Sequence, residues 1–323
     1  MKHRHLFAGA FALMALLAVP GSAAATPSYS LRVEAPGATL DPGTRYAVRS
    51  PIGAPRGETL ANGNCARGQG RIPLAGRTAL GLAATAFNAT KALNPLWVVE
   101  DGFGRRICRI ASFNETDTPF TGWLYRVNQV APPVSAELAP LKHADEVLWV
   151  FADFGSGTNT GDELVLDAPI RTAPGSVEVN VSSVSFDGKV TPAADGTTIT
   201  GGTSPVTTAG GKALVPIAPG VSFLRATADA ATPTEIASSS LSVCALANPA
   251  DCPAQRGLRI VGTNLKDRFK GGPGHDVIRT RGGRDKVRVR GGGRDVVNCG
   301  KGRDFVIADA SDKLRKCEKV KRV

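Results

Sequence analysis

The C-terminal region repeats a short unit, and this repeat restricts the fold of that region more than any other feature of the chain. Its aspartates recur at intervals of 9, 9, 10 and 9 positions: Asp267, Asp276, Asp285, Asp295 and Asp304. An apolar residue follows each aspartate after two positions, and a glycine precedes four of the five by two positions. Such a period is typical of stacked turns in which the apolar residue points inward and glycine allows a tight corner. The sequence therefore predicts a solenoid over residues 262–323.

The same region carries the basic excess of the chain. Residues 254–323 contain 20 Lys and Arg against 8 Asp and Glu, whereas residues 1–253 contain 19 against 20. Concentrated positive charge attracts polyanions, so an anionic cell-surface polymer is the partner that we expect here. No aromatic residues are interleaved for base stacking, so specific recognition of nucleic acid is not predicted.

The residue before each aspartate is basic in every repeat: Lys266, His275, Arg284, Arg294 and Arg303. The nine-residue spacing predicts that the three arginines lie one above another, separated by ~4.8 Å. A guanidinium beside each carboxylate is also expected to neutralise it, so that Arg–Asp pairs hold the turns together. The alternative is a solvated face that binds nothing, and the sequence leaves both interpretations open.

The segment Gly271-Gly272-Pro273-Gly274-His275-Asp276-Val277-Ile278-Arg279 resembles the nonapeptide of hemolysin-type calcium-binding (RTX) repeats, with partial matches from Gly291 and Gly300. The resemblance implies a short parallel β-roll in which corner carbonyls and aspartates enclose Ca²⁺, a cation that prefers oxygen ligands. The metal ligands that it implies are Gly272, Gly274, Asp276, Asp285, Asp295 and Asp304. Flanking basic residues would repel a dication, so the sequence leaves open whether calcium binds.

Residues 1–25 have the pattern of a secretory signal. A basic start, Met1–His5, precedes an apolar run from Leu6 to Val19 and the small residues Ala23–Ala25. The apolar run is shorter than the ~20 residues that cross a bilayer, and no later stretch is longer. We expect a secreted or cell-surface protein without a transmembrane segment.

Six cysteines follow this segment, an even number that predicts disulfides in an oxidising compartment. Fifteen pairings are open from sequence alone. Pairing between neighbours along the chain predicts three bonds: Cys65 with Cys108, Cys244 with Cys252, and Cys299 with Cys317. A zinc site is the weaker alternative because the chain has no CxxC motif.

Residues 26–170 are predicted to form a mixed α+β unit. Thr78–Lys91 has helical spacing of apolar residues behind a capping threonine, and the stretch Pro51–Gly70 is rich in turn-forming residues. Strands are expected near four apolar runs: Leu31–Val33, Leu96–Val99, Trp123–Val127 and Glu146–Phe151.

The segments Gly122–Asn128 and Leu141–Trp149 resemble the DUF4430 family, which is similar to the C-terminal domain of transcobalamin. The resemblance covers about Tyr29–Phe154 and implies a β-grasp-like fold. In transcobalamin this domain helps to enclose cobalamin, so the resemblance implies a cobalamin-like small molecule as an alternative ligand. The candidate cofactor-binding residues are Trp123, Tyr125 and Trp149, whose other interpretation is packing in the core.

Residues 171–247 have short alternating runs between turn dipeptides, which predicts an Ig-like β-sandwich, and residues 248–261 are expected to be a linker. The chain as a whole is therefore predicted to be multidomain and mainly β. It contains no nucleophile elbow, phosphate-binding loop or zinc-protease motif. We expect a non-catalytic binding or adhesion protein, with a small-molecule binder as the first alternative and an extracellular enzyme as the second.

Overall fold

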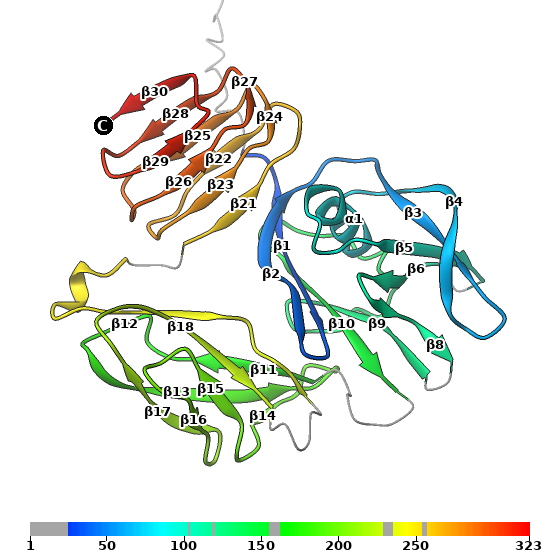
Figure 1. Cartoon of the computed structure of the whole chain (residues 1–323), viewed down its shortest axis with the longest axis horizontal. Coiled ribbons are helices and arrows are strands. Elements are labelled where there is room, and N and C mark those ends of the chain that lie inside the picture. The colour runs from blue at the N-terminus through cyan, green and yellow to red at the C-terminus, as the bar shows by residue number, and fades with distance from the viewer. Residues whose placement is uncertain (1–24, 103, 118–119, 155–161, 229–234, 254–256) are drawn as a thin grey trace, which may run out of the picture.

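The computed structural model describes residues 25–102, 104–117, 120–154, 162–228, 235–253 and 257–323. These residues form one α-helix, one 3-10 helix and thirty strands, so the chain is mainly β and built of several units, as predicted. Figure 1 shows a first unit that carries the helix, a middle unit, and a C-terminal unit of short stacked strands. The predicted signal segment up to residue 24 lies outside the described residues. No helix in the described part of the chain is long and apolar enough to cross a membrane.

The first unit, residues 25–154, packs helix α1 (Ala79–Ala89) against two sheets. In one sheet the strand order is β2 (Ala38–Ala47), β1 (Ser28–Ala35), β10 (Glu146–Asp153), β9 (Phe120–Val127) and β8 (Thr116–Asp117). In the other it is β4 (Cys65–Leu74), β3 (Ile52–Thr59), β5 (Leu96–Asp101), β6 (Gly104–Ile110) and β7 (Phe113–Asn114). The four predicted strands correspond to β1, β5, β9 and β10.

The predicted helix is confirmed, and so is its start. Thr78 lies just before the first turn, and its Oγ1 accepts a hydrogen bond from the backbone N–H of Gly81. This bond satisfies one of the amide groups that a helix leaves open at its N-terminus. Leu80 and Leu82 are fully buried between the sheets, so the apolar face of the helix forms the centre of this core.

The stretch Pro51–Gly70, which is rich in turn-forming residues, lies mostly in strands β3 and β4. β3 pairs antiparallel with β4, and the Cys65–Cys108 disulfide ties β4 to β6. Gly57 makes room for that disulfide, since a Cβ there would lie 2.8 Å from Cys108 Sγ. Glycine content predicted a turn here, whereas these glycines permit close packing of neighbouring strands.

The middle unit stacks two sheets over an apolar core. One sheet contains β14 (Val190–Pro192), β13 (Gly175–Val184), β11 (Asp162–Asp167) and β19 (Glu235–Ile236), with β17 (Lys212–Ile217) also paired to β13. The other contains β12 (Arg171–Thr172), β20 (Leu241–Ala245), β18 (Gly220–Thr227), β15 (Thr198–Thr200) and β16 (Val206–Thr207). Because β11 pairs with β13, this unit begins by Asp162, earlier than the expected residue 171.

The C-terminal unit, residues 257–323, is a coil of parallel strands in two facing layers, and we call it the C-terminal coil. One layer orders β21 (Arg259–Val261), β23 (Val277–Arg279), β26 (Val296–Asn298) and β29 (Lys313–Arg315). The other orders β22 (Arg268–Lys270), β25 (Lys286–Val289), β28 (Phe305–Ala308) and β30 (Lys319–Arg322). The corner strands β24 (Gly282–Gly283) and β27 (Lys301–Gly302) pair with each other. Successive repeats alternate between the layers, so each strand pairs with the strand two repeats further along the chain.

The first unit and the C-terminal coil share one sheet. β2 pairs in parallel with β21, with Arg45 beside Ile260 and Tyr46 beside Val261, which joins the strands into a nine-stranded sheet. In Figure 1 the blue strands β1 and β2 lie beside the orange strands of the coil. The segment 248–261, expected to be a linker, holds the 3-10 helix Pro249–Asp251 and then this pairing strand.

All three predicted disulfides are present: Cys65–Cys108, Cys244–Cys252 and Cys299–Cys317. Each bond lies within one structural unit or at its end. Cys299 is fully buried in the core of the coil, so the third disulfide fastens the last turn to that core.

Candidate functional site

The repeat aspartates point into the coil and are buried: Asp267, Asp276, Asp285, Asp295 and Asp304 are each at most 1 % exposed. From Asp276 onward, their Oδ1 atoms accept hydrogen bonds from backbone N–H groups one full turn earlier. The amides of Asp267, Asp276 and Asp285 donate to Asp285, Asp295 and Asp304 respectively, at 2.7 to 2.8 Å. Asp312 and Glu318 accept the last such bonds, from the amides of Asp295 and Asp304. The aspartates therefore connect successive turns of the backbone.

The second carboxyl oxygen is less well satisfied toward the end of the coil. Asp276 Oδ2 accepts from the amide of Gly272 at 2.7 Å, but Asp295 Oδ2 and Asp304 Oδ2 have no hydrogen-bond partner among the described residues. Burial raises the pKa of Asp285 to about 6 and that of Asp295 to about 7. Burial is also the main cause of the raised pKa of Asp276 and Asp304. Transfer out of water disfavours the charged carboxylate, so Asp285 and Asp295 change protonation near neutral pH.

The expected Arg–Asp pairs between the repeats are not formed in the described part of the coil. Among the residues that the structure describes, the one repeat aspartate in an ion pair is Asp267, and its partner is Arg49 of the first unit, 3.2 Å away. The basic residue before each aspartate points outward because side chains alternate along an extended chain, and Arg284, Arg294 and Arg303 are exposed. The prediction of internal neutralisation was therefore wrong, and backbone amides take the role assigned to the arginines.

The expected stack of three arginines is also divided. Arg294 precedes β26, in the layer of β23, whereas Arg284 and Arg303 precede β25 and β28 in the other layer. The amide of Arg294 donates to Nδ1 of His275, one turn before it. A nine-residue repeat contributes half a turn here, so arginines of consecutive repeats lie on opposite sides of the coil.

The arrangement of the implied metal ligands differs from that of a calcium cage. Calcium takes six to eight oxygen ligands around one point, but the described residues contain no group of three or more acidic, histidine or cysteine side chains placed to hold a metal ion. Both oxygens of Asp276 already accept backbone amides, from Leu258 and Gly272. Gly274 is buried at the corner, where its carbonyl accepts from Gly293. These residues build the backbone of the coil, and calcium binding by them stays a prediction.

The outer face of the β22–β25–β28–β30 layer is almost wholly basic. The strand register places eight side chains on this face in two rows across the four strands. The first row is Arg268, Lys286, Phe305 and Lys319, and the second is Lys270, Arg288, Ile307 and Lys321. Their inward neighbours, such as Phe269, Val287 and Val306, are buried. We call these eight residues the basic face.

The positive charges of the basic face have no compensating carboxylates. None of its six basic side chains forms an ion pair with any described residue. Like charges on neighbouring strands repel each other, so this arrangement costs stability in the absence of a counter-ion. Lys319 and Lys321 discourage pairing at the open edge strand β30. Edge protection does not account for Lys286 and Arg288, because β25 lies inside the layer.

Sequence analysis located the basic excess in residues 254–323 but did not identify Lys286, Lys319 and Lys321 as neighbours on one face. A signal for them is present in the alternation of basic and apolar residues along Lys286–Val289 and Lys319–Lys321. A period of two is typical of a strand with one face buried, and here the other face is uniformly cationic.

The predicted aromatic ligand residues lie on β9 and β10 and contact one another or the core. Trp149 is 2 % exposed, donates from Nε1 to the carbonyl of Ala79, and stacks on Tyr125 with ring centroids 5.4 Å apart. Trp123 packs against Phe151 at 5.2 Å. These contacts support the core-packing interpretation, and ligand binding by the three residues stays a prediction.

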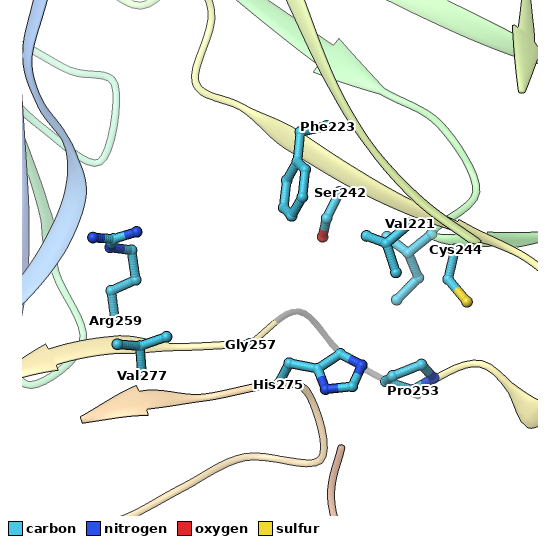
Figure 2. A pocket seen from close by; sticks show the side chains of 10 residues that line it. Val221, Phe223, Ser242, Cys244, Pro253, Gly257, Arg259, His275 and Val277 are labelled. Carbon is cyan, nitrogen blue, oxygen red and sulfur yellow. The ribbon is translucent and has the colours of Figure 1, made fainter. Parts of the chain in front are cut away.

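A cleft of about 230 Å³ lies between the middle unit and the coil. Figure 2 shows Val221 and Phe223 on one side of this cleft and Arg259, His275 and Val277 on the other. Phe223 is 64 % exposed, so one wall is apolar and the other carries basic groups. Residues 254–256, which lie outside the described part of the chain, follow Pro253 at its edge, and we assign no role to this cleft.

Comparison with known proteins neither supports nor contradicts the resemblances to DUF4430 and to RTX repeats. No protein-family model, no curated protein and no solved structure matches the chain.

Proposed function

We propose that the chain is an exported, non-catalytic binding protein that attaches to an anionic polymer through its C-terminal coil. The observation that carries this proposal is the basic face, with six cationic residues at eight outward positions and no ion pair among the described residues. A flat array of unpaired charges attracts a polyanion because binding releases the counter-ions of both surfaces. Export is supported by three disulfides, which persist in oxidising compartments.

Two further features fit attachment to an extended surface. Neighbouring strands lie about 4.8 Å apart and alternate residues on one strand roughly 6.7 Å apart, so the basic face forms a grid that can contact several charges of one polymer. Phe305 and Ile307 lie between the basic residues of β25 and those of β30 and add apolar contact area. Such a grid distinguishes ligands by the charge and spacing of their anionic groups. This agrees with the expectation that the chain does not recognise specific nucleic-acid sequences.

The alternation of parallel strands between two layers supports the β-roll expectation for the coil, and the two stacked sheets support the sandwich expectation for the middle unit. In this proposal the middle unit and the first unit hold the coil in one orientation. Calcium takes no part in the binding step of this proposal, because the repeat aspartates are buried inside the coil and one oxygen of Asp285, Asp295 and Asp304 accepts a backbone amide.

The test compares charge removal on the basic face with equal charge removal elsewhere. The variant K270Q/R288Q/K321Q removes the charges of one row of the face, and the control R67Q/K91Q/K142Q removes three exposed charges from the first unit. Binding of the full exported chain to heparin and to polyphosphate is measured over a range of sodium chloride concentrations.

We expect the face variant to bind at least tenfold more weakly at 150 mM salt, with a salt slope that is shallower by roughly one per contact removed. The control should bind like the wild type. Equal losses in the two variants, or no loss in either, would contradict the proposal.

A further inference from the structure

A second cleft, of about 170 Å³, lies where the first unit meets the coil. Thr44 and Tyr46 on β2 line one side, and Thr90 lies at the C-terminal end of α1. The remaining wall comes from β21 and β23, in the layer opposite the basic face. The cleft therefore exists only because the two units share a sheet.

Three arginines converge on this cleft: Arg259, Arg279 and Arg281. The register pairs Arg259 with Val277 and Val261 with Arg279, so the first two arginines project on the same side of neighbouring strands. Arg281 follows β23 with a left-handed φ of 73° and donates to the carbonyl of Asn88 at 3.4 Å. The strand register and this bond to the end of α1 place all three residues along the lining of one cleft.

No carboxylate lines the cleft, and none of the three arginines forms an ion pair with a described residue. The nearest acidic group on β2 is Asp41, which is 2 % exposed. Its carboxylate accepts hydrogen bonds from the amides of Gly43 and Thr44 and from the hydroxyl of Tyr46. Asp41 therefore lies behind the Tyr46 side chain and is already engaged, so the cleft itself is cationic.

We propose that this cleft binds a phosphate monoester group. Arginine matches phosphate because its planar fork donates two parallel hydrogen bonds to neighbouring oxygens. Hydroxyl groups of Thr44 and Thr90 lie among the lining residues and supply further polar contacts. The volume matches one phosphate with a short substituent, and the site is distinct from the basic face because it lies in the opposite layer of the coil. Because β2, β21 and β23 are hydrogen-bonded in one sheet, the strands that carry Arg259 and Arg279 are in place before the ligand arrives, so the entropy lost on binding is limited to that of the side chains.

The test uses R259Q/R279Q and a matched control, R284Q/R303Q, which removes two exposed arginines from the other layer of the same coil. Arg281 is left unchanged because it caps α1. Inorganic phosphate and glycerol 3-phosphate are titrated calorimetrically into the full exported chain and both variants at 150 mM sodium chloride, with circular dichroism as a check of folding.

We expect saturable binding of both probes to the wild type and the control, and at least tenfold weaker binding to R259Q/R279Q. Tighter binding of glycerol 3-phosphate than of inorganic phosphate would identify the ester as the ligand. A flat wild-type isotherm at millimolar phosphate, or equal losses in the two variants, would overturn the proposal. Heparin binding by R259Q/R279Q is measured in parallel, because its retention separates this site from the basic face.

Discussion

Arg32 on β1 and Glu163 on β11 form a buried ion pair across the boundary between the first and middle units, with Nη1 and Oε1 2.5 Å apart. Arg32 also pairs with Glu34 at 3.2 Å, and Glu34 in turn binds Arg225 of the middle unit. Both side chains of the Arg32–Glu163 pair are at most 4 % exposed. A charge network that is shielded from water holds these two units in one orientation.

Replacing Arg32 with Met should strongly destabilise this boundary, because Glu163 would remain buried without its partner. Breaking a buried ion pair in this way costs ~3–5 kcal/mol, measured as a lower midpoint of urea unfolding. The double variant R32M/E163L should lose less free energy of unfolding than R32M and E163L lose together as single variants. For comparison, K212M breaks the exposed Lys212–Glu178 pair and should cost at most ~1 kcal/mol. If R32M lost no more free energy of unfolding than K212M, the charge network would not be what stabilises this boundary.

The buried aspartates predict that the coil is more stable in acid than at alkaline pH. The pKa of Asp295 is about 7 in the folded chain, above its ordinary value of 3.8. When folding raises the pKa of a carboxyl group, the free energy of unfolding falls as the pH rises from the pKa of the unfolded chain to that of the folded chain. Hydrogen exchange of peptides within residues 276–308 should therefore be slower at pH 5 than at pH 8, after correction for the intrinsic rate.

An amide in place of the Asp295 carboxyl group should remove much of that pH dependence. The asparagine of D295N would keep an oxygen for the amide of Asp276, and its NH₂ would occupy the position of Oδ2, which has no partner among the described residues. D295N should therefore match the wild type at pH 5 and be more protected at pH 8. D167N, at an exposed aspartate of β11, is the control and should behave like the wild type. If the hydrogen-exchange protection of D295N depended on pH as in the wild type, the pH dependence would not come from Asp295.

Two glycines with positive φ should differ in their tolerance of alanine. At Gly302, with φ +143°, a Cβ would lie 1.7 Å from the carbonyl oxygen of Gly283 one turn away. At Gly291, with φ +78°, a Cβ would meet nothing within 4 Å. G291A should cost only the conformational strain, ~1–3 kcal/mol, whereas G302A should cost more because the turns must separate. Thermal unfolding of the two variants checks this order.

Removal of calcium should leave the coil folded. One carboxyl oxygen of each aspartate that the RTX resemblance assigns to calcium accepts a backbone amide one turn earlier in the chain. We expect EDTA to change neither the circular dichroism spectrum nor the unfolding temperature, and calcium titration to release no saturable heat. Calcium-dependent folding would instead require these aspartates to rearrange around the ion.

Local patterns predicted several of the individual elements. The helix behind Thr78, the strands around Trp123 and Trp149, and the three neighbouring disulfides all follow from short-range signals. The hairpin of β3 and β4 did not, because its glycines and prolines have turn propensity. Pairing with β5 and the Cys65–Cys108 bond override that propensity.

The nine-residue period of the C-terminal coil was visible in the sequence, but the number of repeats in one turn was not. The main strands are short and each corner reverses the chain, so two repeats are needed to return to the same layer. That geometry decides which basic residues become neighbours. Lys270 and Arg288, two repeats apart, lie side by side, whereas Arg284 and Arg294, in consecutive repeats, lie in different layers.

The sequence alone determined the nine-residue repeat and the location of the basic excess, and it predicted the mainly β composition and, from pairing between neighbours along the chain, the three disulfides that the structure contains. Those properties depend on residues that are close in the chain or on simple periodicity. Tertiary structure decided which groups lie next to each charged side chain. The pairing of β2 with β21, which belong to the first and last units of the chain, brings Thr44 and Tyr46 to Arg259 and Arg279. Contacts between such distant segments depend on the packing of whole units, for which a single sequence carries no local signal.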